Sequence, residues 1–185
     1  RRRIAVVLVV LIIAAIMAVG SGLLGTSIAM LGDMTDSISL YLNRAGAGWP
    51  ANTGIRTPTQ VEPLAGGFVE MDNEDVAVYS AYGAKIRTIQ PGYARPALAV
   101  GNTRFVLYNR AGKELTVQSR TRQLYAKSFN NAIMLCEMAQ NGTLAVVTES
   151  DRYAAEVMVY DASFSGDPFT WKLTSTDGTP IALSF

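Results

Sequence analysis

From residue 61 onward the sequence is a succession of short apolar runs, and this pattern restricts the fold more than any other feature. The runs are rich in Val, Ile, Tyr, Phe and Thr, and Gly, Asn, Asp or Pro interrupts them every eight to twelve residues. This spacing is typical of antiparallel β-strands joined by tight turns. No long amphipathic helix interrupts the pattern, so we predict an all-β domain over residues 61–185. The expected strands are residues 67–71, 76–80, 85–89, 97–100, 104–108, 115–119, 124–128, 133–138, 144–149, 157–160 and 170–174.

Several of these strands are apolar on consecutive residues, which indicates that both faces of their sheet are covered. Stacked blades of a β-propeller and the two sheets of a β-sandwich would both give this pattern. A weak repeat favours the propeller, because the runs ending in Tyr79 and Tyr108 are each followed four residues later by Gly, at Gly83 and Gly112. The domain has room for about three four-stranded, WD40-like blades, whereas closed propellers use four to eight. We therefore expect a truncated propeller in which residues 181–185 open another blade.

The N-terminal region predicts a membrane anchor. Residues 4–31 carry no charge and follow Arg1, Arg2 and Arg3. A helix over residues 4–24 would reach about 31 Å, close to the hydrocarbon thickness of about 30 Å. The positive-inside rule then keeps the N-terminus cytoplasmic and places the domain outside the cell membrane, which the chain crosses once. A cleavable signal peptide is the alternative to this signal anchor, since Ala18-Val19-Gly20 fits a cleavage site.

These patterns divide the chain into three parts. Residues 1–31 form the cytoplasmic basic tip and the transmembrane helix. Residues 32–60 contain the end of that helix, with Asp33 and Asp36 on its polar side, and then a linker rich in Gly and Pro. Residues 61–185 form the propeller-like domain.

Composition excludes several kinds of catalysis within this chain. Histidine is absent and Cys136 is the only cysteine, so no histidine-dependent triad, disulfide or cysteine-based zinc site is available. Cys136 lies among apolar residues and is expected to be buried. Acidic residues cluster at Glu70, Asp72, Glu74 and Asp75 and again at Glu149 and Asp151, and both groups fit solvated turns. We assign no catalytic, metal or cofactor residues, and expect no cofactor.

Charge is distributed unevenly along the domain. Residues 85–127 contain nine lysines and arginines but only one acidic residue, Glu114. A blade built from them could present a surface for an anionic envelope polymer or for lipid headgroups. The acidic segments on either side could equally neutralise it. The candidate anion-binding patch consists of Arg87, Arg104, Arg110, Lys113, Arg120, Arg122 and Lys127.

A family resemblance agrees with this layout. Its motifs are Gly46-Ala47-Gly48-Trp49-Pro50, Val78-Tyr79-x-x-x-Gly83, Tyr93-Ala94-Arg95-Pro96, and Asn141-Gly142-Thr143-Leu144-Ala145-Val146-Val147-Thr148 before Val159-Tyr160-Asp161. With the apolar N-terminus, they resemble the uncharacterised domain-of-unknown-function 5711 family of Firmicutes. The resemblance implies one membrane helix and an exported propeller-like domain, and it implies no activity or site residues.

Two functional hypotheses follow. The first is a membrane-anchored, extracytoplasmic propeller that serves as a binding, scaffolding or sensing module of the cell envelope. Its partners would be the membrane, an anionic polymer, lipid headgroups or another envelope protein, and not nucleic acid. The second is an envelope hydrolase whose carboxylates converge at the propeller mouth. The absence of histidine favours the non-enzymatic hypothesis.

Overall fold

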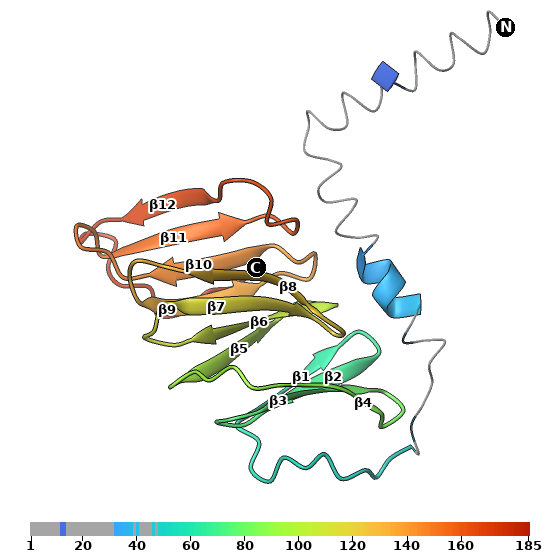
Figure 1. The fold of residues 1–185 in the computed structure, drawn as a ribbon. Coiled ribbons are helices and arrows are strands. Elements are labelled where there is room, and N and C mark those ends of the chain that lie inside the picture. The colour runs from blue at the N-terminus through green and yellow to red at the C-terminus, as the bar shows by residue number, and fades with distance from the viewer. Residues whose placement is uncertain (1–11, 14–31, 39, 41–45, 47) are drawn as a thin grey trace, which may run out of the picture.

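Twelve strands form three four-stranded antiparallel sheets in the computed structural model, which describes residues 12–13, 32–38, 40, 46 and 48–185 (Figure 1). In each sheet the strands pair in chain order, so every connection within a sheet joins neighbouring strands. The first sheet contains β1 (Gln60–Leu64), β2 (Gly67–Met71), β3 (Val76–Ser80) and β4 (Lys85–Ile89). The second contains β5 (Pro96–Val100), β6 (Arg104–Asn109), β7 (Glu114–Ser119) and β8 (Gln123–Ser128). The third contains β9 (Ile133–Met138), β10 (Leu144–Thr148), β11 (Ala155–Tyr160) and β12 (Phe169–Leu173).

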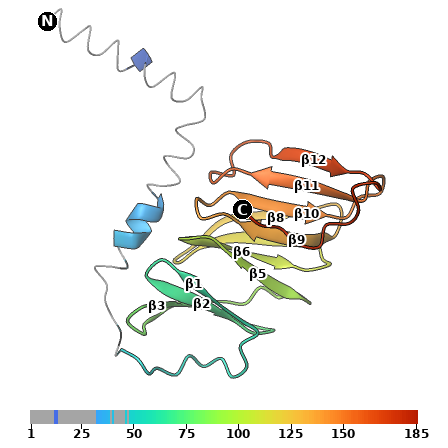
Figure 2. The ribbon, with the colours of Figure 1, turned by 180° about the vertical axis from the view of Figure 1, so that it is seen from behind.

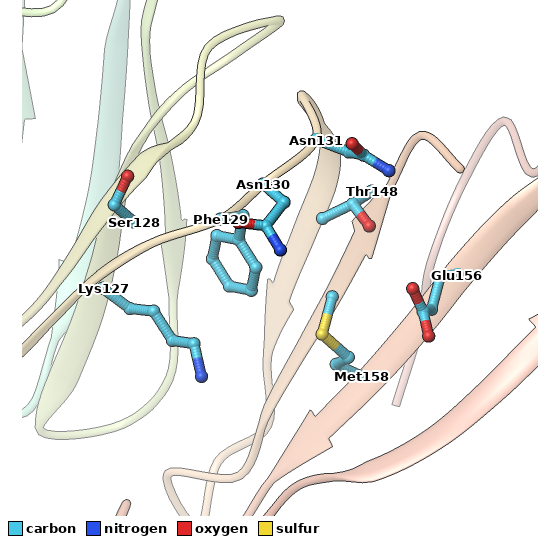
Figure 3. A pocket seen from close by; sticks show the side chains of 8 residues that line it. All are labelled: Lys127, Ser128, Phe129, Asn130, Asn131, Thr148, Glu156 and Met158. Atoms are coloured by element: carbon cyan, nitrogen blue, oxygen red, sulfur yellow. The ribbon is translucent and has the colours of Figure 1, made fainter. Parts of the chain in front are cut away.

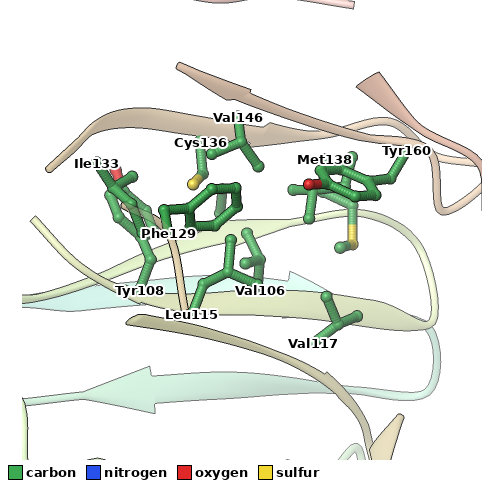
Figure 4. Close-up of a cluster of buried hydrophobic side chains, with 12 residues drawn as sticks. Val106, Tyr108, Leu115, Val117, Phe129, Ile133, Cys136, Met138, Val146 and Tyr160 are labelled. Carbon is green, nitrogen blue, oxygen red and sulfur yellow. The ribbon is translucent and has the colours of Figure 1, made fainter. Parts of the chain in front are cut away.

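The second sheet is packed on both faces, which explains its consecutive apolar residues. Along β6, Phe105 and Leu107 enter the core shared with the first sheet, while Val106 and Tyr108 enter the core shared with the third. Alternate residues of a strand point to opposite faces, so one run supplies two cores. Figure 4 shows the second of these cores, with Phe129 between the two sheets.

The order of the sheets is that of successive propeller blades. Strand β5 lies against both β1 and β9, so the first strands of the three sheets are neighbours. The fold is therefore propeller-like, and three stacked sheets do not form the two-sheet sandwich that was the alternative.

The eleven strands expected between residues 67 and 174 are all present, with ends that differ by no more than a few residues. Strand β1 was not expected, because Pro63 within it is a poor strand former. It lies at the edge of the first sheet, where the missing N–H of proline is tolerated. The expected strand at 181–185 is not observed, since these residues pair with no neighbouring strand among the described residues.

The lead-in before β1 covers the outer face of the first sheet, which no other described sheet covers. The Trp49 ring lies 5.4 Å from Phe68 and 6.3 Å from Tyr79, measured between ring centroids. The Trp49 indole N–H also donates to the Ala81 carbonyl at 3.0 Å. The Tyr79 hydroxyl donates to the Thr53 carbonyl. The segment expected to be a linker is thus attached to the domain.

A helix over residues 32–38 lies beside the stack, as seen from behind in Figure 2. The predicted membrane helix falls outside the described residues, apart from Ile12 and Ile13, which are helical. Within the described part of the chain, no helix combines the length and the apolar character needed to span a bilayer.

Candidate functional site

A pocket of about 260 Å³ opens between the second and third sheets, next to the chain that links them. Its walls come from the end of β8, the following loop, the end of β10 and β11 (Figure 3). The residues that line it are Lys127, Ser128, Phe129, Asn130, Asn131, Thr148, Glu156 and Met158. Lys127 and Glu156 extend into the same space from opposite sides, and Met158 lies between them.

The Lys127 ammonium group is held against aromatic rings. Its Nζ lies 5.2 Å from the Tyr160 ring centroid and 5.7 Å from that of Phe129. A hydrogen bond with Tyr160 raises the pKa of Lys127, although partial desolvation opposes this effect. Desolvation in turn raises the pKa of Tyr160. Lys127 is therefore a fixed positive charge at neutral pH.

Glu156 provides the opposite charge on β11. None of the described residues forms a hydrogen bond or ion pair with its carboxylate. A second hollow of about 180 Å³ shares Asn131 and Glu156 with the pocket and adds Asp151, Arg152 and Lys172. Lys172 is the cross-strand partner of Glu156 on β12. The two hollows adjoin at Asn131 and Glu156 and are together called here the inter-sheet groove. Lys127, Arg152 and Lys172 bring positive charge to it, and Glu156 and Asp151 bring negative charge.

The structure separates the predicted basic patch into several places. Arg110 and Lys113 belong to the turn between β6 and β7, while Arg120 and Arg122 belong to the turn at the opposite end of β7. Arg87 donates to Gln118 Oε1 at 3.0 Å, and desolvation lowers the pKa of Arg87. Lys127 lies in the inter-sheet groove. The seven residues therefore do not form one continuous surface.

Arg104 is turned inward and binds the chain's own acidic helix. Its side chain is 6% exposed, and its Nε lies 2.9 Å from Asp33 Oδ2. Thr103 also donates to that carboxylate at 2.9 Å, and Arg104 donates to the Ala162 carbonyl at 2.5 Å. This ion pair joins helix 32–38 to the second sheet and, through Ala162, to the loop after β11.

Arg120 makes a second link to the same helix. It donates to the Ser37 hydroxyl and to the Ala65 carbonyl, each at 2.6 Å. Desolvation lowers the pKa of Arg120, and the nearby charges of Asp36 and Asp33 oppose this effect. Asp33 and Asp36 lie three residues apart, within one helical turn, so the sequence indicates that both carboxylates share one side of a helix. The arginines near these carboxylates, Arg104 and Arg120, lie far along the chain.

We expect Asp33→Ala to release helix 32–38 from the domain. Hydrogen bonds to charged groups contribute about 1.5–3 kcal/mol, so amide exchange within the helix should become roughly 10- to 100-fold faster. A helix this short has little stability alone. Hydrogen exchange read by mass spectrometry measures the effect. Asp167→Ala is the control, because Asp167 is exposed and forms no hydrogen bond with a described residue. Unchanged protection in Asp33→Ala would show that the ion pair does not hold the helix.

The predicted acidic clusters do not converge. Glu70 and Asp72 belong to the first sheet and its turn, whereas Glu149 and Asp151 follow β10 in the third. The Asp72 carboxylate accepts hydrogen bonds from the backbone N–H groups of Glu74 and Asp75, which lower its pKa. No group of three metal-ligating side chains occurs among residues that the structure describes.

Cys136 is buried, as expected, in the core between the second and third sheets. Burial raises the pKa of its thiol. The thiolate that reacts with labelling reagents is therefore scarce at neutral pH.

Comparison with solved structures gives low overall similarity. BamB from Moraxella catarrhalis matches with 13% identity and a TM-score of 0.48, over 62% of this chain and 35% of that one. HIRA(644-1017) matches with 13% identity and a TM-score of 0.46, over 65% of this chain and 41% of that one. A putative exported protein from Bacteroides fragilis has 20% identity and a TM-score of 0.42, over 65% and 38%. The chain thus matches only about two fifths or less of each.

Comparison with protein families is more informative. No curated protein matched the sequence. The sequence model of one family, described as Family of unknown function (DUF5711), matches residues 51–185. This span includes all twelve strands. The chain therefore belongs to the DUF5711 family of unknown function.

Proposed function

We propose that this protein is a non-enzymatic interaction module, held at the outer face of the cell membrane, that binds its partner in the inter-sheet groove. The observation that carries the proposal is the pair of opposite charges, Lys127 and Glu156, which face one open pocket without pairing with each other. Two charges that form a structural ion pair would be in contact, within about 4 Å. Charges held apart across a pocket are available to a ligand.

Membrane attachment rests on the sequence and agrees with the position of helix 32–38. This helix directly follows the predicted membrane span, and Arg104 and Arg120 attach it to the domain. The domain would therefore stand close to the bilayer and move with the anchor. Envelope scaffolding or sensing requires such a fixed position.

If the domain stands close to the bilayer, the exposed members of the basic patch would lie near anionic lipid headgroups. Arg110, Lys113 and Arg122 are exposed, and Arg122 lies beside Gly32, near the anchored end of the helix. We propose lipid headgroups as the ligand of Arg122. Cosedimentation of Arg122→Gln with anionic vesicles should fall relative to the unchanged protein at low salt, and the difference should vanish at high salt. Equal cosedimentation at low salt would contradict this assignment.

The hydrolase hypothesis receives no such support. Its carboxylates would have to converge at one mouth, yet Glu70 Oε1 accepts a hydrogen bond from Thr53 Oγ1 of the lead-in at 3.4 Å, whereas Glu149 follows β10 in the third sheet. General acid and base groups must reach the same substrate.

The membrane topology can be tested by cysteine labelling in intact cells that express the full chain. Gln140→Cys places a thiol in the exposed turn between β9 and β10. A membrane-impermeant maleimide should label this variant before lysis if the domain is outside. The unchanged chain is a matched control, because its buried Cys136 should stay unlabelled. Labelling of Gln140→Cys only after lysis would overturn the extracytoplasmic location.

A further inference from the structure

We infer that the inter-sheet groove binds a short zwitterionic peptide, with the ligand's carboxylate at Lys127 and its ammonium group at Glu156. The inference rests on the proposed function, since it names the ligand of the same groove. It starts from charge. A ligand that enters this pocket removes water from both Lys127 and Glu156. Lost hydration of a charge is restored by an opposite charge or by strong hydrogen bonds, and a ligand that carries both signs supplies charge-assisted hydrogen bonds at both residues.

The uncharged polar residues between the two charges suit a peptide group. The Asn131 amide nitrogen donates to the Glu149 carbonyl at 3.1 Å, which orients the side chain and leaves its oxygen as an acceptor. Asn130 on the loop after β8 and the largely buried Thr148 at the end of β10 also line the pocket (Figure 3). A peptide N–H and C=O need one acceptor and one donor each, which amide and hydroxyl side chains supply.

The size and apolar floor of the groove limit the peptide. The pocket of about 260 Å³ equals the volume of about nine liquid waters, which suits one or two small residues. Met158, which is partly exposed, offers an apolar surface for a small side chain. The adjoining hollow, which Asp151, Arg152 and Lys172 line together with Glu156, gives space for one further residue.

Other ligand classes fit less well. A neutral sugar stacks on an exposed aromatic face, but Phe129 is only 9% exposed and Lys172 covers the Tyr153 ring at 5.2 Å. A neutral ligand would also leave the Lys127 ammonium group desolvated without a counter-charge. A purely anionic polymer would bring negative charge against Glu156.

Binding of trialanine to the full chain in detergent micelles tests the inference, with calorimetry or NMR titration as the measurement. The probes are trialanine with free termini and its N-acetylated, C-amidated and doubly blocked forms. Each blocked end should weaken binding about tenfold or more, which corresponds to the loss of one charge-assisted hydrogen bond. Lys127→Met should bind the free and C-amidated peptides equally. Glu156→Gln should bind the free and N-acetylated peptides equally.

Matched controls separate these local effects from general ones. Lys113→Met and Glu74→Gln remove exposed charges outside the groove and should leave all four affinities unchanged.

Equal binding of the four probes would overturn the inference, as would absence of saturable binding by folded protein at millimolar peptide. Binding of polyglutamate that depends on Lys127 and is tighter than that of trialanine would assign the groove to an anionic polymer instead. A failed topology experiment, by contrast, would remove the membrane location and leave the peptide result intact.

Discussion

Phe105→Ala should lower the free energy of unfolding by about 3–5 kcal/mol, the usual cost of removing a phenylalanine from a packed core. Phe105 is fully buried in the core between the first and second sheets, where it packs with Leu98 and Leu107. Truncation removes apolar burial and leaves a cavity that two paired sheets cannot easily close. Denaturant unfolding of the full chain, followed by tryptophan fluorescence, measures the change.

Phe169→Ala is the matched control for this substitution. Phe169 is 70% exposed on the edge strand β12, so its truncation should change stability by less than about 0.5 kcal/mol. A loss below about 1 kcal/mol in Phe105→Ala would mean that the first and second sheets are not packed together as described.

Gly67→Ala should destabilise the first sheet by about 3 kcal/mol, at the upper end of the cost of overpacking. A Cβ at Gly67 would lie 1.8 Å from the Tyr79 carbonyl oxygen on the paired strand β3. Because that atom belongs to the backbone, the strands must separate locally and lose ladder hydrogen bonds. The same unfolding measurement applies.

Gly166→Ala is the control, because it makes the same Gly→Ala change at a position where the added Cβ meets no neighbouring atom. A Cβ at Gly166 meets nothing within 4 Å, so this variant should be nearly neutral. Equal stabilities of the two alanine variants would contradict the close approach of β2 and β3 at Gly67.

The candidate site was predicted only in part. Lys127 was predicted as one of seven members of a basic patch, but the structure places it in a groove apart from Arg104 and Arg120. Glu156 was not predicted at all, because a single acidic residue at the start of an apolar strand resembles an ordinary exposed position. Its role depends on the packing of the second sheet against the third. The residue patterns of β8 and β11 do not indicate which sheets will pack together.

Asp33 illustrates the same limit on the other side of the domain. The residue spacing predicted that Asp33 lies in a helix. Its partner Arg104 lies 71 residues away along the chain, so local spacing could not identify the ion pair. The arginines were interpreted as an open surface for anions, whereas two of them are buried against the helix.

The strands and turns could be predicted from residue order, because alternation, β-branched residues and turn residues act over a few neighbouring positions. Burial on both faces of β6 could also be inferred, because consecutive side chains of a strand point to opposite faces. When all of them are apolar, both faces must be shielded from water. The partners of Arg104, Lys127 and Glu156 became known only from the stacking of the sheets. Hydrogen bonds and ion pairs require their atoms to lie within about 3–4 Å in space, and residues brought that close can lie anywhere along the chain.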